Sequence, residues 1–191
     1  VMQDPDSQFC TFTVEDEIAF GLENFGTPPE EIGEHIAAAL DMVGLPGIEK
    51  RFLNDLSGGQ KQRVSIAGVL AMHPKCIILD EPTAMLDPNG RKEVIRAVRA
   101  LNDVEGITVI LITHYMEEVI HADHVYVMDK GSVKMQGTPK EIFSQVEKLK
   151  ELRLSVPQVT LLSYELKKAG VPLPDGILET EELIRELKKV Q

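Results

Sequence analysis

Residues 76–90 read CIILDEPTAMLDPNG, and this stretch decides the fold. Residues 76–79 form a continuous apolar run, which is typical of a strand that is buried on both faces. Pro88 can occupy the first turn of a helix, whose apolar residues recur at helical spacing as far as Leu101. Residues 107–113 form a second run that is apolar and β-branched. Strand, helix and strand in this order predict a βαβ unit with parallel strands and a right-handed crossover.

Helical periodicity predicts two helices ahead of this unit. One is expected to open at residues 28–29, which are both proline, with Thr27 as its N-cap, and to end before Gly44. The other is expected over residues 58–71, where apolar residues share one face. A helical part therefore precedes the βαβ unit.

Beyond the second strand the chain changes in character. Residues 124–128 and 133–136 flank a Lys-Gly pair and predict a hairpin, after which a helix is expected from Thr138 toward Lys150. The last part of the chain contains two short amphipathic helices, the second capped by Thr180. Two such helices alone bury too little apolar surface to be stable, so we expect this tail to pack on the body or on a partner.

Composition narrows the class of protein. The 191 residues are 43% hydrophobic and 27% charged, which is a soluble globular profile. A formal charge of -11 makes nucleic acid a poor partner, but phosphate ligands can still be held by backbone N–H groups and Mg²⁺. The two cysteines, Cys10 and Cys76, form no CxxC pair and indicate reduced thiols in a cytosolic compartment.

Two adjacent acids follow the first predicted strand. Ligands bind at the carboxyl ends of the strands in open α/β sheets, and Asp80 and Glu81 lie at such an end. Asp80 is suited to a Mg²⁺ shell, and Glu81 is suited to orient or deprotonate an attacking water. Taken alone, an Asp-Glu pair is common, and the interpretation as two solvated acids at a strand end would be preferred.

A second candidate site is LSGGQ at residues 56–60. Gly58 and Gly59 beside Ser57 leave backbone N–H groups unobstructed at a helix start, where the helix dipole attracts anions. The alternative interpretation is a capped helix with a glycine turn.

In combination these strings carry a resemblance. LSGGQ followed by an apolar strand that ends in DEPT resembles the nucleotide-binding domain of ABC-type ATPases. Asp87 resembles the aspartate of that family's D-loop, His114 its H-loop histidine and Gln3 its Q-loop glutamine, all in the family's order. The resemblance implies a P-loop NTPase-like α/β fold with a mainly parallel sheet, and ATP and Mg²⁺ as ligands.

The resemblance also implies roles for these residues. Glu81 and His114 would be catalytic, with His114 contacting the γ-phosphate on its own side. Asp80 and Gln3 would hold Mg²⁺, and Gln3 would also bind the nucleotide. The remaining nucleotide-binding residues would contact ATP between two subunits: Ser57, Gly58, Gly59, Gln60 and Asp87.

A narrower likeness covers both ends of the chain. Residues 3–21 and 154–172 are similar to energy-coupling factor (ECF) transporter ATPases, which serve uptake of cobalt, nickel or vitamins. This likeness implies a partial ABC ATPase domain at residues 1–148, with a helical subdomain at about 15–72. It also implies an α-helical C-terminal extension at 149–191 that helps to hold two ATPases together.

The implied partners follow from the same likeness. They are a second ATPase subunit, identical or related, a transmembrane coupling subunit docked near residues 3–25, and a separate membrane component that binds the substrate. The protein would then lie on the cytoplasmic face of the membrane.

The sequence departs from the family in one respect. It contains no phosphate loop of the form GxxxxGK[ST], and the part that would carry one is expected to be missing from its N-terminal end. We therefore expect the isolated chain to bind ATP weakly and to hydrolyse it negligibly. Two alternatives are a non-catalytic interaction module and a soluble ABC ATPase of DNA repair or translation; the acidic balance argues against the second.

Overall fold

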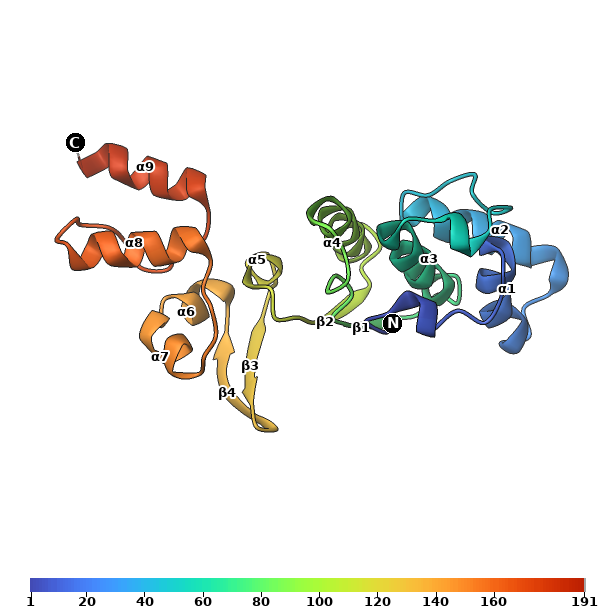
Figure 1. Ribbon diagram of the computed structural model, residues 1–191, viewed down its shortest axis with the longest axis horizontal. Helices are drawn as coiled ribbons and strands as arrows, with labels where there is room; N and C mark the ends of the chain where they lie inside the picture. Colours follow the sequence, from blue (N-terminus) through green and yellow to red (C-terminus); the bar gives the residue numbers. More distant parts are fainter. Residues whose placement is uncertain (191) are drawn as a thin grey trace. The chain divides into compact units, whose positions relative to one another are not determined.

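The computed structural model describes residues 1–190 and divides into two compact units, Val1–Thr113 and His114–Gln191 (Figure 1). Each unit has its own hydrophobic core. The division expected from the sequence, between residues 148 and 149, falls within helix α7 (Val146–Glu151) and stays a prediction.

The first unit is built around one central helix. Helix α3 (Gly58–Leu70) packs against α1 (Val14–Asn24), α2 (Pro29–Met42) and α4 (Pro88–Asp103), as Figure 1 shows. Two 3-10 turns, η1 (Pro5–Ser7) and η2 (Leu53–Asp55), complete this part. The fully buried side chains of the core come from all four helices and from the first strand: Val14, Ile18, Leu40, Val64, Ile66, Leu79 and Val94.

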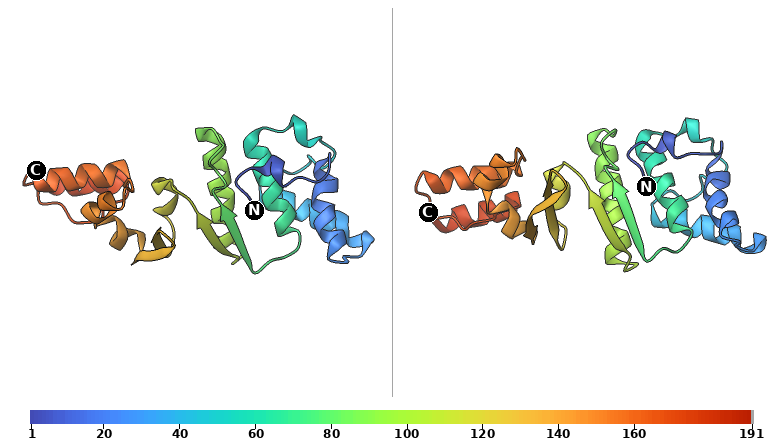
Figure 2. Two further views of the ribbon diagram at one scale, coloured as in Figure 1. Left: turned by 60° about the horizontal axis from the view of Figure 1, so that its bottom comes forward. Right: turned by 90° about the horizontal axis from the view of Figure 1, so that it is seen from below.

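The predicted βαβ unit is confirmed. Strands β1 (Cys76–Asp80) and β2 (Thr108–Ile112) pair in parallel and lie side by side next to α4, which connects them (Figure 2). Val1 extends this sheet on the edge of β1 away from β2. Its ammonium group donates to the carbonyl of Ile78 at 2.9 Å, and its carbonyl accepts from the N–H of Asp80 at 3.1 Å.

The expectation that these strands are buried on both faces is wrong. In β1 burial alternates, with Ile77 and Leu79 buried but Ile78 53% exposed. Its neighbour across the pair, Ile110 of β2, is 47% exposed. The helices of the unit pack on one face of the sheet, and no element of the described first unit covers the other.

Two helix predictions need correction. The N-cap position of α2 is occupied by Pro28, not Thr27, and no side chain caps this helix. The helix expected from Thr138 toward Lys150 is broken into α6 (Pro139–Phe143) and α7. The break has a local cause, because the hydroxyl of Ser144 and the side-chain amide of Gln145 both donate to the carbonyl of Glu141 and compete with the helical bonding pattern.

The second unit contains the predicted hairpin, β3 (Val125–Asp129) and β4 (Ser132–Gly137), after the short helix α5 (Met116–Val119). Helices α6 and α7 pack on it, and their buried side chains include Phe143 and Leu149. Helices α8 (Gln158–Lys168) and α9 (Thr180–Val190) lie side by side in Figures 1 and 2 and share a small core with the segment between them. The tail therefore packs within its own unit.

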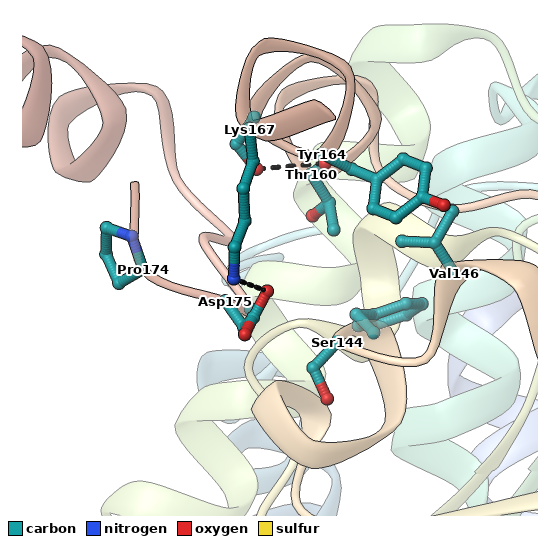
Figure 3. A pocket seen from close by; sticks show the side chains of 10 residues that line it. Ser144, Val146, Thr160, Tyr164, Lys167, Pro174 and Asp175 are labelled. Atoms are coloured by element: carbon teal, nitrogen blue, oxygen red, sulfur yellow. Dashed lines mark hydrogen bonds and ion pairs between the residues drawn. The ribbon is translucent and has the colours of Figure 1, made fainter. Parts of the chain in front are cut away.

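A small hollow lies between α8, the segment that follows it and the junction of α6 and α7 (Figure 3). Lys167 on α8 forms an ion pair with Asp175 at 2.7 Å across its mouth. Its volume of about 10 Å³ leaves room for about one water molecule, so it is a packing defect and not a ligand site.

None of the helices within residues 1–190 combines the length and hydropathy that crossing a bilayer requires.

Candidate functional site

Glu81 stands at the carboxyl end of β1 in an unusual backbone conformation. Its N–H donates to the carbonyl of Ile112 at the end of β2, at 2.9 Å. Its φ is +46°, in the left-handed region that side-chain-bearing residues rarely adopt. Such strain costs on the order of 1 kcal/mol and persists where the surroundings impose it, most often at functional sites.

Gln3 lies beside this acid. Its Nε2 donates to Oε2 of Glu81 at 3.0 Å. The contact exists because Val1 is hydrogen-bonded along β1, which carries residue 3 to the carboxyl end of the strand. The structure thus brings together two residues that the sequence analysis assigned to one site.

The donor set suits a Mg²⁺ ion. Mg²⁺ takes oxygen ligands and usually keeps several waters, so it needs one or two protein carboxylates beside the substrate phosphates. Asp80 is exposed at the strand end, and Gln3 uses its amide nitrogen toward Glu81, which leaves its amide oxygen for a cation. Within residues 1–190 no group of three or more His, Cys, Asp or Glu side chains is arranged to hold a metal without such help.

The LSGGQ segment forms the N-terminus of α3. The Ser57 hydroxyl accepts from the N–H of Gln60 at 3.3 Å, while Oε1 of Gln60 accepts from the N–H of Ser57 at 3.0 Å. This reciprocal pair is a capping box, so the interpretation as a capped helix is confirmed. Because Ser57 and Gly58 are exposed, the same helix end can also face an anion.

Asp87 lies next to that helix end. Its carboxylate accepts from the N–H of Gly90 at 3.1 Å and caps α4. A Cβ placed on Gly59 would stand only 3.1 Å from Cα of Gly90, so the two helix starts touch through their backbones. Ser57–Gln60 and Asp87 therefore form one surface.

His114 is the first residue of the second unit. Its ring stacks on Tyr115 with centroids 4.2 Å apart. Its predicted role at the γ-phosphate stays a prediction.

Sequence reasoning missed three residues of α3 that fix this helix to the segment around Gln3 and to α4. Lys61 pairs with Asp6 at 2.6 Å, Gln62 donates to the carbonyl of Met2 at 3.3 Å, and Arg63 pairs with Glu93 at 2.9 Å. One signal was available, because Gln62 is a polar residue on the buried face of the helix.

Comparison with known proteins agrees with this geometry. A model of the ABC transporter family matches residues 1–84. The energy-coupling factor transporter ATP-binding protein EcfA1 of Caldanaerobacter subterraneus is 56% identical over 184 residues, which cover 96% of this chain and 66% of that protein. The EcfA1 proteins of Clostridium perfringens and Clostridioides difficile are 54% and 50% identical, and the matches cover 66% and 68% of their lengths.

A solved structure supports the fold. It is cbiO1 of Clostridium perfringens, described as part of the ABC transporter complex cbiONQ, with a TM-score of 0.70 and 40% sequence identity. The match covers 82% of this chain and 63% of that one. The chain thus spans about two thirds of the length of the curated relatives it matches. It belongs to the ABC transporter ATP-binding proteins, in the energy-coupling factor group.

Proposed function

We propose that this chain serves in an ATP-hydrolysing subunit of an ECF-type importer, in which Glu81 orients and deprotonates the water that attacks the γ-phosphate. The observation that carries the proposal is the Glu81 carboxylate at the carboxyl end of a parallel strand pair, which is presented by a strained backbone and accepts a hydrogen bond from Gln3. A general base in this position contributes about 10²–10⁴-fold to the rate.

The other residues that the resemblance assigns to this reaction would each have a task. Asp80 and Gln3 would hold Mg²⁺, which would neutralise charge on the phosphates. His114 donates to the γ-phosphate on its own side. Because the 191 residues contain no GxxxxGK[ST], we expect the isolated chain to bind ATP weakly and to hydrolyse it negligibly.

The second ATP contact comes from another ATPase subunit. The exposed start of α3, with Ser57 and Gly58, offers backbone N–H groups and the positive end of a helix dipole to the γ-phosphate of ATP bound there. The second unit would hold the pair together through apolar side chains of α8 and α9 that face solvent, Leu162 at 52% and Ile184 at 48% exposure.

A membrane partner would dock on the helical part of the first unit. There α1, α3 and the segment before α1 enclose a hollow of about 190 Å³, lined by Phe20, Val64 and Met72 among others. Glu17 also lines it, but its carboxylate accepts from the N–H groups of Cys10 and Thr11.

Exposed aromatic side chains lie on the same part of the unit. Phe12 is 80% and Phe25 is 76% exposed. Such a surface suits a short apolar helix of a transmembrane coupling subunit, and cbiO1 is described as part of a transporter complex. The transported substrate, a metal ion or a vitamin, would be chosen by a separate membrane component.

The test is Glu81→Gln in the full-length gene product. We expect ATP binding to be retained and hydrolysis to fall by at least about 10²-fold, because the amide cannot take a proton. Glu34→Gln, at an exposed position on α2, is the matched control and should leave turnover unchanged. Unchanged hydrolysis in Glu81→Gln would remove Glu81 from its role, and no hydrolysis in the unsubstituted protein would reject the proposed function.

A further inference from the structure

Gln62 occupies an unusual position on α3. Its side chain is fully buried, with 0% of its surface exposed. Its Nε2 donates to the backbone carbonyl of Met2 at 3.3 Å, whereas its Oε1 is buried without a hydrogen-bond partner. Burying an amide with only one of its polar atoms paired costs free energy, because the other atom loses its hydrogen bonds to water. An apolar side chain of the same length would avoid this cost.

The backbone group that Gln62 holds lies one residue before Gln3, which contacts the proposed catalytic acid. The N–H of Met2 donates to Oε1 of Gln8 at 3.1 Å, so the backbone of residue 2 is held at both its N–H and its carbonyl. The next residue is Gln3, whose amide donates to Glu81. A shift of the Met2 carbonyl therefore moves the group that orients the Glu81 carboxylate.

The other end of the connection is the LSGGQ segment. Gln62 lies within the first two turns of α3, five residues after the capping Ser57. Lys61, the preceding residue, makes a second tie to the same N-terminal segment through Asp6 at 2.6 Å. The start of α3 and the residues around Gln3 are thus joined by two side chains of one helical turn.

We propose that Gln62 is a positioning residue, whose buried amide sets the place of Gln3 relative to Glu81 and ties the LSGGQ helix to the catalytic acid of its own chain. The inference rests on the proposed function, in which the start of α3 contacts ATP held by another subunit. A movement of α3 on that contact is passed through Gln62 to Gln3, and so couples one nucleotide site to the other.

The first test is Gln62→Met in the full-length gene product. Methionine matches the length of glutamine but cannot donate to Met2. We expect kcat to fall roughly tenfold with KM for ATP within about twofold, as for other residues that orient the ligands of a metal ion. The urea midpoint should stay the same or rise, because the unpartnered Oε1 is removed.

Asn102→Leu is the matched control. It removes an amide-to-carbonyl hydrogen bond of the same kind, from Asn102 to Ile107 at 3.0 Å, at the far end of α4. This variant should lower the urea midpoint and leave kcat unchanged. If Gln62→Met behaves in the same way, with lowered stability and unchanged kcat, Gln62 is structural only and the inference is wrong.

A second readout is independent of hydrolysis. The chain has no tryptophan, and Met2 is 61% exposed, so Met2→Trp introduces one fluorophore at the tethered segment. Adding Gln62→Met should lower its fluorescence anisotropy, whereas adding Asn102→Leu should not. Unchanged anisotropy would show that Gln62 does not hold the segment around Met2, and the inference would be wrong. This measurement needs no ATP hydrolysis, so it still applies if the proposed function fails.

Discussion

The side-chain amide of Gln3 lies 3.0 Å from the carboxylate of Glu81, although the two residues are 78 positions apart. The contact is made at a residue with a left-handed backbone, since the φ of Glu81 is +46°. A residue with ordinary backbone geometry at the strand end would aim its side chain elsewhere. Strain and hydrogen bond together therefore fix the direction of this carboxylate.

Removing the backbone strain at Glu81 should raise the stability of the protein and abolish its hydrolysis of ATP. Glycine adopts a positive φ without steric cost, so Glu81→Gly should raise the free energy of unfolding by about 1 kcal/mol. Hydrolysis in the full-length gene product should be lost. The measurements are urea denaturation followed by circular dichroism, and phosphate release.

Lys130→Gly provides the matched control, because Lys130 has a φ of +49° in the β3–β4 turn. It should stabilise by a similar amount and leave hydrolysis unchanged. Destabilisation by Glu81→Gly would show that the contacts of the side chain outweigh the backbone strain.

The two tasks of Ser57 can be measured apart. Ser57→Ala removes the cap of α3 and should cost about 1 kcal/mol of stability. Ser57→Asp keeps an N-cap acceptor, so stability should be near that of the unsubstituted protein, but its negative charge opposes a phosphate at the helix start. We expect hydrolysis to be lost in Ser57→Asp at normal stability, and full activity of this variant would contradict the phosphate contact.

The neighbouring glycines should differ in their tolerance of a side chain. A Cβ on Gly59 would meet Cα of Gly90 at 3.1 Å, and the backbone there cannot move alone. A Cβ on Gly58 would meet only Cδ2 of Leu86 at 3.2 Å, a flexible side chain. Gly59→Ala should therefore cost about 1–3 kcal/mol, and Gly58→Ala much less, in urea denaturation of the chain. An equal loss of stability in the two variants would contradict the close backbone contact between Gly59 and Gly90.

Much of this fold can be predicted from patterns among residues that are close together in the sequence. The apolar runs and the proline at the start of α4 predict the βαβ unit, because burial and backbone restriction act locally. The resemblance to ABC ATPases also implies that Gln3 and Glu81 belong to one site. Their contact could not be derived from the sequence, because it depends on the pairing of Val1 with β1 and on a positive φ at a glutamate.

Burial of the strands was predicted wrongly for a related reason. An apolar run shows that a strand can be covered on both faces, but the elements that cover it lie far away in sequence. Gln62 was missed because a polar residue on a buried helix face gives no sign of its partner. Its partner is a backbone carbonyl 60 residues away.

Acid should weaken the second unit. A hydrogen bond from Tyr164, and next one from Lys168, hold the pKa of Glu147 below its ordinary value of 4.5. Hydrogen bonds from the backbone and then the hydroxyl of Thr138 lower the pKa of Glu141 in the same way. Folding favours the charged forms, so the stability they contribute is present above about pH 4.5 and is lost as the pH falls through the folded pKa values.

The measurement is the melting temperature of the chain between pH 3 and pH 6. Glu147→Gln should flatten its dependence on pH, and Tyr164→Phe should flatten it partly. Lys188→Gln, on α9, should leave it unchanged. An undiminished acid slope in Glu147→Gln would assign the effect to other carboxylates.

The face of the β1–β2 pair that no element of the described first unit covers should make the isolated chain associate with itself. Ile78 and Ile110 are directly opposite one another and about half exposed, so together they form an apolar patch beside a sheet edge.

Replacing them by an opposite-charge pair, Ile78→Lys with Ile110→Glu, should shift light scattering toward the monomer. The cost in stability should stay below about 1 kcal/mol, because cross-strand ion pairs offset part of the lost packing. Val104→Glu, at a residue beyond the C-terminal end of α4 that is 76% exposed, is the control and should leave association unchanged. Association that persists in the double variant would instead locate it on another surface, such as the exposed leucines of α8.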